Sequence, residues 1–457
     1  MKRLAAWGGF ALLALGVVLV ARAALLPSHQ LEVEPAPRID VDTAALARRL
    51  AGGLRFQTIS HQDRGRLDAA AFLGFHRYLA ESYPAAHAAL ERETVSAYSR
   101  LYTWKGRDPA LPAVLLLAHH DVVPVEAGTA DEWQQPPFSG VIADGFVWGR
   151  GAMDDKGSIF CLFEAVEALL VEGFRPERDV YLAFGHDEEV GGDDGAVRIA
   201  ERLASRGVEV EYVLDEGGII AQDFVPGAEL PVAVIGIAEK GSVSIALEIE
   251  APGGHSSIPP RHTAIGELAA AVGALERHPI PGGVDRTTAL FFDRLAPELP
   301  FGARLVLANR WLFGPLLEPV LSRVPAMNAM LRTTTAVTIF EGGVKENVLP
   351  SRARAVANFR IRPGDTIESV AEHVRTTIDD ERIQLQVGVR SQPRNPSSVS
   401  RIDSEAYTHL AQTIREVFPG TAVVPYLVLG GTDARHYEGL SDSVYHFGPY
   451  IYGRDSM

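Results

Sequence analysis

The chain has 457 residues, 47% of them hydrophobic and 22% charged, which is enough apolar material for more than one globular domain. Its net charge of −15, with no Lys/Arg-rich block, argues against a nucleic-acid partner and against binding of an anionic lipid surface by the folded part. A single cysteine excludes a disulfide within the chain.

The first 26 residues differ from the rest in composition. Lys2 and Arg3 precede an apolar run over 4–21, and residues 21–23 resemble a signal-peptidase site. A run of about 18 apolar residues is also long enough to cross a bilayer, and the basic residues would keep its start in the cytoplasm. We predict a signal peptide or membrane anchor over 1–26 and a proline-containing linker over 27–42. The rest is expected to be exported, either secreted or facing the periplasm or lumen, with membrane contact only through this segment.

Helical and strand-like patterns alternate over 43–239. Apolar residues at helical spacing predict helices at 44–54, 69–82, 157–173 and 195–206, and short apolar runs predict buried strands at 114–117, 180–184 and 211–214. This alternation is typical of an α/β domain with a largely parallel sheet covered by helices on both faces. Residues 43–239 are therefore predicted to be the first part of a catalytic domain.

The pattern changes after residue 240. Residues 242–249 and 353–361 alternate with period two, which indicates strands with one face covered, and a helix is predicted between them at 263–276. Further apolar helical pieces lie within 287–331. We predict a separate α+β domain over 240–364, inserted into the first, and a return to the catalytic sheet over 365–457.

Four short segments offer histidine or carboxylate side chains. They are residues 118–121, 154–157, 187–189 and 214–216. Three of them directly follow a predicted buried strand, and open α/β sheets bind their ligands at the carboxyl ends of the strands. Carboxylates together with an imidazole suit a pair of divalent cations, with zinc favoured.

Three of these segments also have a simpler interpretation. In the first, one histidine of the pair at 119–120 could be a hydrogen-bonded surface residue. Asp121 stands two residues after His119 and can accept its second N–H, so we predict His119 as a ligand and Asp121 as its support. Asp154 precedes a helix, where an N-cap is the alternative to a carboxylate shared by two metals. Glu188 and Glu189 form either a solvated acidic turn or a pair in which one binds metal and the other is the general base.

These segments resemble those of the di-zinc exopeptidase and aminoacylase family, which includes glutamate carboxypeptidase, aminoacylase and succinyl-diaminopimelate desuccinylase. Further matching segments are 133–140, 144–157, 253–257, 347–350, 358–360 and 430–433. The segment at 133–140 is most similar to the branch of Gly-Xaa carboxypeptidases and N-fatty-acyl-amino-acid hydrolases. The resemblance covers nearly all of 43–457.

The resemblance implies a site with two zinc ions. Asp154 would bridge them, His119 and Asp215 would complete one, and Glu189 with a histidine near the C-terminus would complete the other. Glu188 would be the general base. In the family, the last histidine follows a segment like residues 445–450, and neither histidine near that segment, at 436 or 446, stands at the matching position. We expect either that the sequence is truncated before this ligand or that the second zinc site is weakened by its loss.

The resemblance also implies a homodimer formed through residues 240–364. His255 would reach the active site of the partner subunit and stabilise the oxyanion, with Asn347 assisting. Arg360 would bind the substrate carboxylate, although a surface position on a strand is the simpler interpretation. Gly431 and Thr432 would contribute to substrate binding.

The sequence therefore predicts an exported zinc hydrolase that cleaves an amide next to a free amino-acid carboxylate. A small peptide and an N-acyl amino acid remain equally open as substrates. Residues 287–331 would form either an acyl pocket or dimer core, with the second favoured. The alternative is an impaired or inactive relative, or a fragment, that binds such molecules without turnover; retention of Glu188 favours an enzyme.

Overall fold

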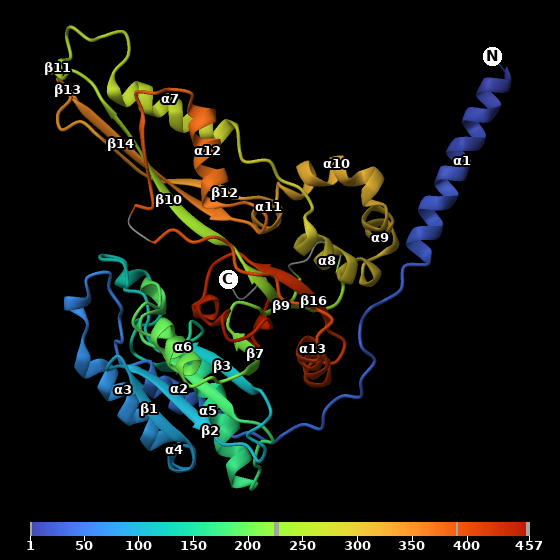
Figure 1. Cartoon of the computed structure of the whole chain (residues 1–457), viewed down its shortest axis with the longest axis vertical. Helices are drawn as coiled ribbons and strands as arrows, with labels where there is room; N and C mark the ends of the chain where they lie inside the picture. The colour runs from blue at the N-terminus through green and yellow to red at the C-terminus, as the bar shows by residue number, and fades with distance from the viewer. Residues whose placement is uncertain (1, 224–227, 390–391, 454–457) are drawn as a thin grey trace.

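Two β-sheets organise the chain, each with its own helices (Figure 1). The computed structural model describes residues 2–223, 228–389 and 392–453. Residues 454–457, which follow the segment where the resemblance implies a last histidine ligand, lie outside the described residues. The larger sheet has ten strands. They are β1 (Glu91–Val95), β2 (Ser99–Trp104), β3 (Ala113–His119), β6 (Val180–Gly185), β7 (Val210–Asp215), β8 (Ile220–Ala221), β9 (Val232–Glu239), β16 (Ala422–Val428), β17 (Val444–His446) and β18 (Ile451–Tyr452).

The centre of the larger sheet is parallel. β3 pairs in parallel with both β6 and β7, and β17 pairs in parallel with β7. Antiparallel pairs occur nearer the edges, as between β1 and β2. The carboxyl ends of β6, β3 and β7 therefore lie side by side at one edge of the sheet. The prediction of an α/β fold with a largely parallel sheet is confirmed.

Helices cover both faces of this sheet. One face carries α2 (Thr43–Gly53), α3 (Ala69–Ser82), α4 (Pro84–Ala89) and α5 (Lys156–Val171), and the other carries α6 (Ala196–Ser205) and the short η5 (Asp433–Tyr437). The first core is aromatic, with Phe75, Phe160 and Phe163 all fully buried. Asp68 caps α3 by accepting hydrogen bonds from the first backbone N–H groups of that helix. The helices and strands predicted over 43–239 are confirmed to within two residues at each end.

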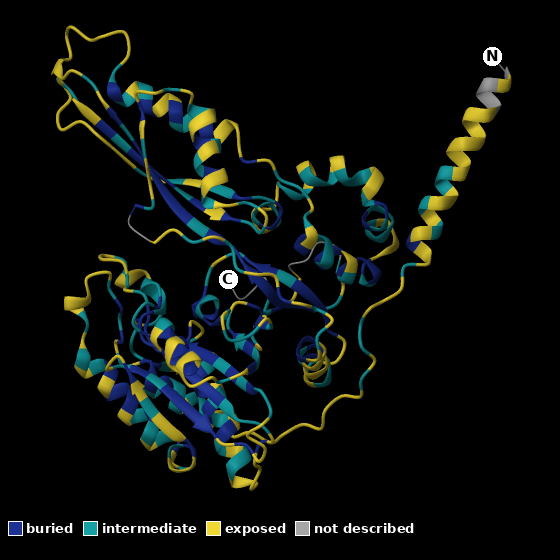
Figure 2. Cartoon of the chain, in the orientation of Figure 1, coloured by how far each residue is buried: buried dark blue, intermediate teal, exposed yellow. Residues whose placement is uncertain are grey.

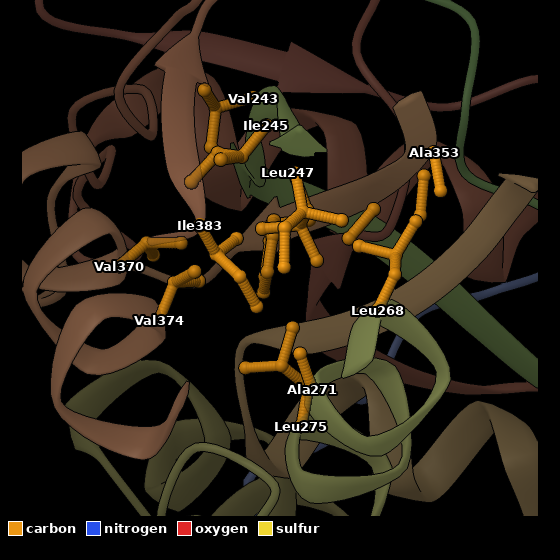
Figure 3. Packing of buried hydrophobic residues seen from close by; sticks show 14 of the residues in the cluster. Val243, Ile245, Leu247, Leu268, Ala271, Leu275, Ala353, Val370, Val374 and Ile383 are labelled. Carbon is orange, nitrogen blue, oxygen red and sulfur yellow. The ribbon is translucent and has the colours of Figure 1, made fainter. Parts of the chain in front are cut away.

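The smaller sheet has the order β12-β14-β10-β15. Its strands are β10 (Gly241–Glu250), β12 (Thr334–Gly342), β14 (Arg352–Ile361) and β15 (Gln384–Val387), and α7 (Ala264–Arg277) and α12 (Ile367–Ile378) cover one face. Figure 3 shows their shared core, with Leu247 and Leu268 facing each other between sheet and helices. At the far end, β11 (Gly254–His255) pairs with β13 (Val348–Leu349).

Two parts of the predicted domain division are wrong. The chain does not return to the larger sheet at residue 365, because α12 packs on α7 and β15 pairs with β10. The helices α8 (Arg286–Leu295), α9 (Phe301–Ala308), α10 (Arg310–Leu321) and α11 (Pro325–Leu331) do not belong to the smaller sheet either. Phe291, Phe292 and Leu295 of α8 are buried against β9 and β16 of the larger sheet. We call α8–α11 the helical module.

The N-terminal helix α1 (Lys2–Ala24) projects from the rest of the chain (Figure 1), and its residues are mostly exposed (Figure 2). Its segment Trp7–Ala24 is long and apolar enough to cross a membrane, with a mean hydropathy of 1.8 and 6% of its residues buried. Residues 27–42 contain no helix or strand, as predicted for the linker. They are nevertheless held in place, because the Gln30 side chain bonds both backbone groups of Val423 on β16.

Candidate metal and catalytic site

The three adjacent parallel strands bring the predicted residues to one edge of the sheet. β3 ends at His119, β7 ends at Asp215, and β6 is followed by the short helix η3 (Glu188–Val190). Asp154 lies just before α5, which packs over β3. Residues more than 90 positions apart in the chain therefore meet in one region.

Three side chains converge closely enough to hold a metal ion. The His119 Nε2 atom lies 2.9 Å from Asp154 Oδ1 and 3.2 Å from Glu216 Oε1, and one ligand atom from each residue lies within 4.8 Å of the others. Burial would lower the pKa of His119, but hydrogen bonds that its ring donates to three carboxylates outweigh burial and raise that pKa well above its usual value. One imidazole nitrogen and two carboxylate oxygens are a donor set typical of zinc.

Asp215, the predicted ligand, is not part of this group. Its Oδ2 atom accepts hydrogen bonds from Thr432 Oγ1 at 2.8 Å and from the Ala434 N–H at 2.9 Å. Successive side chains at the end of a strand point to opposite sides, so Asp215 faces Thr432 while Glu216 faces His119. Sequence reasoning overlooked Glu216, since the two adjacent acids are equivalent in spacing and no local signal distinguishes them.

Asp121 contacts both His119 and the short helix η3, which follows the neighbouring strand β6. It is fully buried, its backbone carbonyl lies 3.1 Å from His119 Nδ1, and its Oδ1 atom lies 3.3 Å from the same nitrogen. The same carboxylate accepts the backbone N–H groups of Glu188 and Glu189 at 3.2 and 3.1 Å. Burial acts to raise the pKa of Asp121, but the bonds to His119 outweigh it, so the pKa is lowered and the carboxylate stays charged. Asp121 therefore lies where its predicted support of His119 requires.

Glu188 and Glu189 border a cavity at this edge. Burial raises the pKa of both carboxyl groups, that of Glu189 to about 7. Glu189 Oε1 accepts the Val123 N–H at 3.2 Å, and Glu189 is outside the group of three residues around His119. The structure thus places Glu189 near the predicted metal site without bringing it into contact with His119.

The cavity has a volume of 1020 Å³ and is rich in cationic side chains. Glu188, Glu189 and Gly431 line it from the larger sheet, and Arg360 lines it from β14 of the smaller sheet. Its wall also contains the cationic side chains of Arg64, Lys240, Arg394 and Arg435, the imidazoles of His61 and His436, and the carboxyl groups of Asp193, Glu239 and Glu438. Thr432 does not line the cavity; its hydroxyl is bonded to Asp215 and to Glu239, which does. The wall is therefore lined by charges of both signs, and its arginines can bind an anionic group of a molecule that also reaches Glu188 and Glu189.

His255 and Asn347 lie elsewhere. His255 is exposed on β11, where its Nδ1 atom and Ser257 Oγ are 2.7 Å apart. Asn347 is next to it, because its carbonyl accepts the Ser256 N–H. Both lie at the end of the smaller sheet that is remote from the larger one (Figure 1), and neither borders the cavity. The structure does not bring these two predicted residues to the Glu188 site of the same chain.

Comparison with known proteins gives consistent matches. The model of peptidase family M20/M25/M40 matches residues 115–456. A probable carboxypeptidase S-like 2 of Dictyostelium discoideum is 42% identical over 89% of this chain and 78% of its own length. The human N-fatty-acyl-amino acid synthase/hydrolase PM20D1 is 40% identical over 91% of this chain and 82% of its own.

Solved structures match the fold. Human carnosine dipeptidase 1 superposes with a TM-score of 0.62 at 16% identity, covering 90% of this chain and 88% of that one. The M20 family metallo-carboxypeptidase Sso-CP2 of Sulfolobus solfataricus gives 0.60 at 19% identity, covering 88% and 90%.

Together with these matches, the imidazole and carboxylates that converge at the edge of the parallel sheet identify a metal-dependent hydrolase. The chain belongs to peptidase family M20/M25/M40, whose members are metal-dependent. It is therefore an enzyme of the amide-hydrolysing class, as predicted.

Proposed function

We propose that this enzyme hydrolyses an amide bond next to a free amino-acid carboxylate. One observation supports this above the others: a single cavity joins Glu188 to a set of cations that includes Arg360. The cations can bind the carboxylate of a substrate while its amide lies beside Glu188. A guanidinium binds a carboxylate through two parallel hydrogen bonds, which fixes its orientation.

We infer that zinc is the metal, bound through His119, Asp154 and Glu216. Two ions remain our proposal, with Asp154 shared between them and Glu189 as a donor to the second. Bound zinc would polarise the amide carbonyl and make water more acidic. The contribution of Asp121 is to fix the orientation of the His119 ring through its second nitrogen.

Glu188 is the proposed general base. It would accept a proton from the attacking water and deliver it to the leaving nitrogen, for which its place in the cavity wall is suitable. Its backbone is fixed by the same Asp121 carboxylate that contacts His119. The proposed base Glu188 and the proposed metal ligand His119 are thus both positioned by the buried side chain of Asp121.

The acyl part of the substrate differs between the two candidate reactions. The relatives include N-fatty-acyl-amino acid synthase/hydrolases and probable carboxypeptidases, and both reactions leave the same kind of carboxylate on the cation side. We therefore propose N-acyl amino acids and short peptides as substrates.

We also propose a homodimer in which His255 and Asn347 serve the partner's active site. Both lie at the exposed end of the smaller sheet, away from Glu188 of their own chain. Mixing His255→Ala chains with Glu188→Gln chains should restore part of the activity, because each mixed dimer would have one complete site. No recovery after subunit exchange would refute sharing.

The central experiment compares Glu188→Gln with the unchanged enzyme on N-acetyl- and N-oleoyl-phenylalanine and on glycyl-phenylalanine. Loss of a general base should lower kcat by about 10²–10⁴-fold, while zinc content stays the same. Methyl esters of the same substrates lack the free carboxylate and should react poorly. Equal turnover of acid and ester would contradict carboxylate binding, and unchanged kcat in the variant would remove Glu188 as the base.

A further inference from the structure

One side of α10 is apolar and exposed. We define the α10 face as Trp311, Leu312, Pro315, Leu316, Pro319 and Val320. These residues recur every three to four positions, so they lie along one side of the helix. Trp311 is 59% exposed, Leu316 67% and Val320 57%, and no residue of α10 is buried. Exposed large apolar residues gathered on one face are a mark of an interaction site.

The charged residues of α10 are directed away from this face. Its sequence contains two, Arg310 and Glu318. Arg310 pairs with Asp293 of α8 at 2.5 Å, and Glu318 pairs with Arg332 after α11 at 2.5 Å. The exposed side of α10 is therefore apolar instead of charged, while Leu317 and Leu321 on its inner side pack against the core as in an ordinary surface helix. The α10 face contains no charge that would oppose its transfer into an apolar medium.

The helical module is attached to the membrane-length helix α1. Arg22 donates hydrogen bonds to the Ala308 carbonyl at 3.2 and 3.3 Å. Asn309, which separates α9 from α10, is fully buried and donates to the Leu19 carbonyl at 3.0 Å. α10 therefore begins beside the last turns of α1, on the side of the module away from α13 (Glu405–Val417) and the larger sheet (Figure 1).

We infer that the α10 face lies in the surface layer of a lipid bilayer and is a second membrane contact beside α1. At 1.5 Å per residue, the 12 residues of α10 span about 18 Å, which is too short to cross a bilayer. A short helix with one apolar face instead lies along the interface, and Trp311 is of the type enriched there. The net charge of −15 makes zwitterionic lipid the appropriate partner.

The test places one fluorescent probe on the α10 face of the full chain. Cys161→Ser removes the native thiol, and Leu316→Cys then carries the environment-sensitive NBD label. The protein is reconstituted through α1 into phosphatidylcholine vesicles with or without doxyl-labelled lipid. The matched control is Val171→Cys at the end of α5, an apolar position that is 80% exposed and far from α1.

The probe at 316 should show blue-shifted emission that doxyl lipid quenches, whereas the probe at 171 should show neither. Changing Leu312 and Val320 to Glu should then reduce the quenching at 316 while circular dichroism is unchanged. An unquenched probe at 316 in inserted protein would overturn the inference. A blue shift that grows with protein concentration and resists doxyl quenching would also overturn it, in favour of contact with a second copy of the chain.

Discussion

Asp121→Asn is the sharpest test of how the site is built, because the change removes charge and leaves shape nearly unaltered. The two carboxylate oxygens of Asp121 have different partners. Oδ1 accepts the Glu188 N–H and faces His119 Nδ1, and Oδ2 accepts the Glu189 N–H. An amide has one oxygen, so one of these positions must receive an NH₂ group.

Either orientation of the amide places its NH₂ group against a buried backbone N–H. Leaving such a donor without an acceptor costs about 1–3 kcal/mol of folding free energy. The variant also loses the negative charge beside His119 Nδ1, and removal of such a supporting group lowers metal affinity by about 10–100-fold. The prediction is therefore a loss of stability of about 1–3 kcal/mol together with a loss of zinc affinity of about 10–100-fold.

The matched control is Asp187→Asn. Asp187 is also buried and accepts two backbone N–H groups, from Asp194 and Gly195, each at 2.8 Å, but it has no bond to His119. Its variant should lose similar stability in urea unfolding and retain zinc affinity in calorimetric titration. If both variants lose affinity equally, or if Asp121→Asn binds zinc like the unchanged protein, the role assigned to Asp121 is wrong.

Three other changes test separate features. Glu216→Gln should weaken zinc binding at least tenfold in calorimetric titration, since Glu216 reaches His119; an unaltered Kd would exclude it as a ligand. Burial and the neighbouring Arg100 guanidinium lower the pKa of His76 to about 3. Between about pH 6.5 and pH 3, the folded state therefore binds fewer protons than the unfolded state. Stability should therefore fall as pH falls through that window, and His76→Asn should reduce this slope in urea titrations at pH 7, 6 and 5 by up to about 1.4 kcal/mol per pH unit. Gly140→Ala should lower the free energy of unfolding by more than about 2 kcal/mol, because φ is +59° and a Cβ would collide with the Ala51 carbonyl, whereas Gly145→Ala has open space and should lose less.

The sequence predicted the three adjacent parallel strands β3, β6 and β7 of the larger sheet, because their signals are local. Each buried strand is a short apolar run bounded by turn residues, and the helices that cover it have clear apolar stripes. The division of the chain between two sheets was predicted less well. The pairing of β15 with β10, 135 or more residues apart, and the packing of α8 on β16 depend on long-range contacts that no local period reveals.

The same distinction applies to the site. His119, Asp121 and Asp154 could be proposed from their places at strand and helix ends, and they meet in the structure. The choice between Asp215 and Glu216 could not be made, since it depends on which side of β7 faces His119. That orientation follows from the hydrogen bonds of Thr432, which lies more than 200 residues further along the chain.

The attachment of Gln30 to β16 has a consequence for where the catalytic centre can work. Only six Cα-to-Cα steps separate Ala24, at the end of α1, from Gln30. Six extended steps reach at most about 20 Å. When α1 is embedded in a bilayer, this short connection keeps the catalytic domain close to the membrane surface. The catalytic site then encounters substrates in the thin layer of solution next to the lipid.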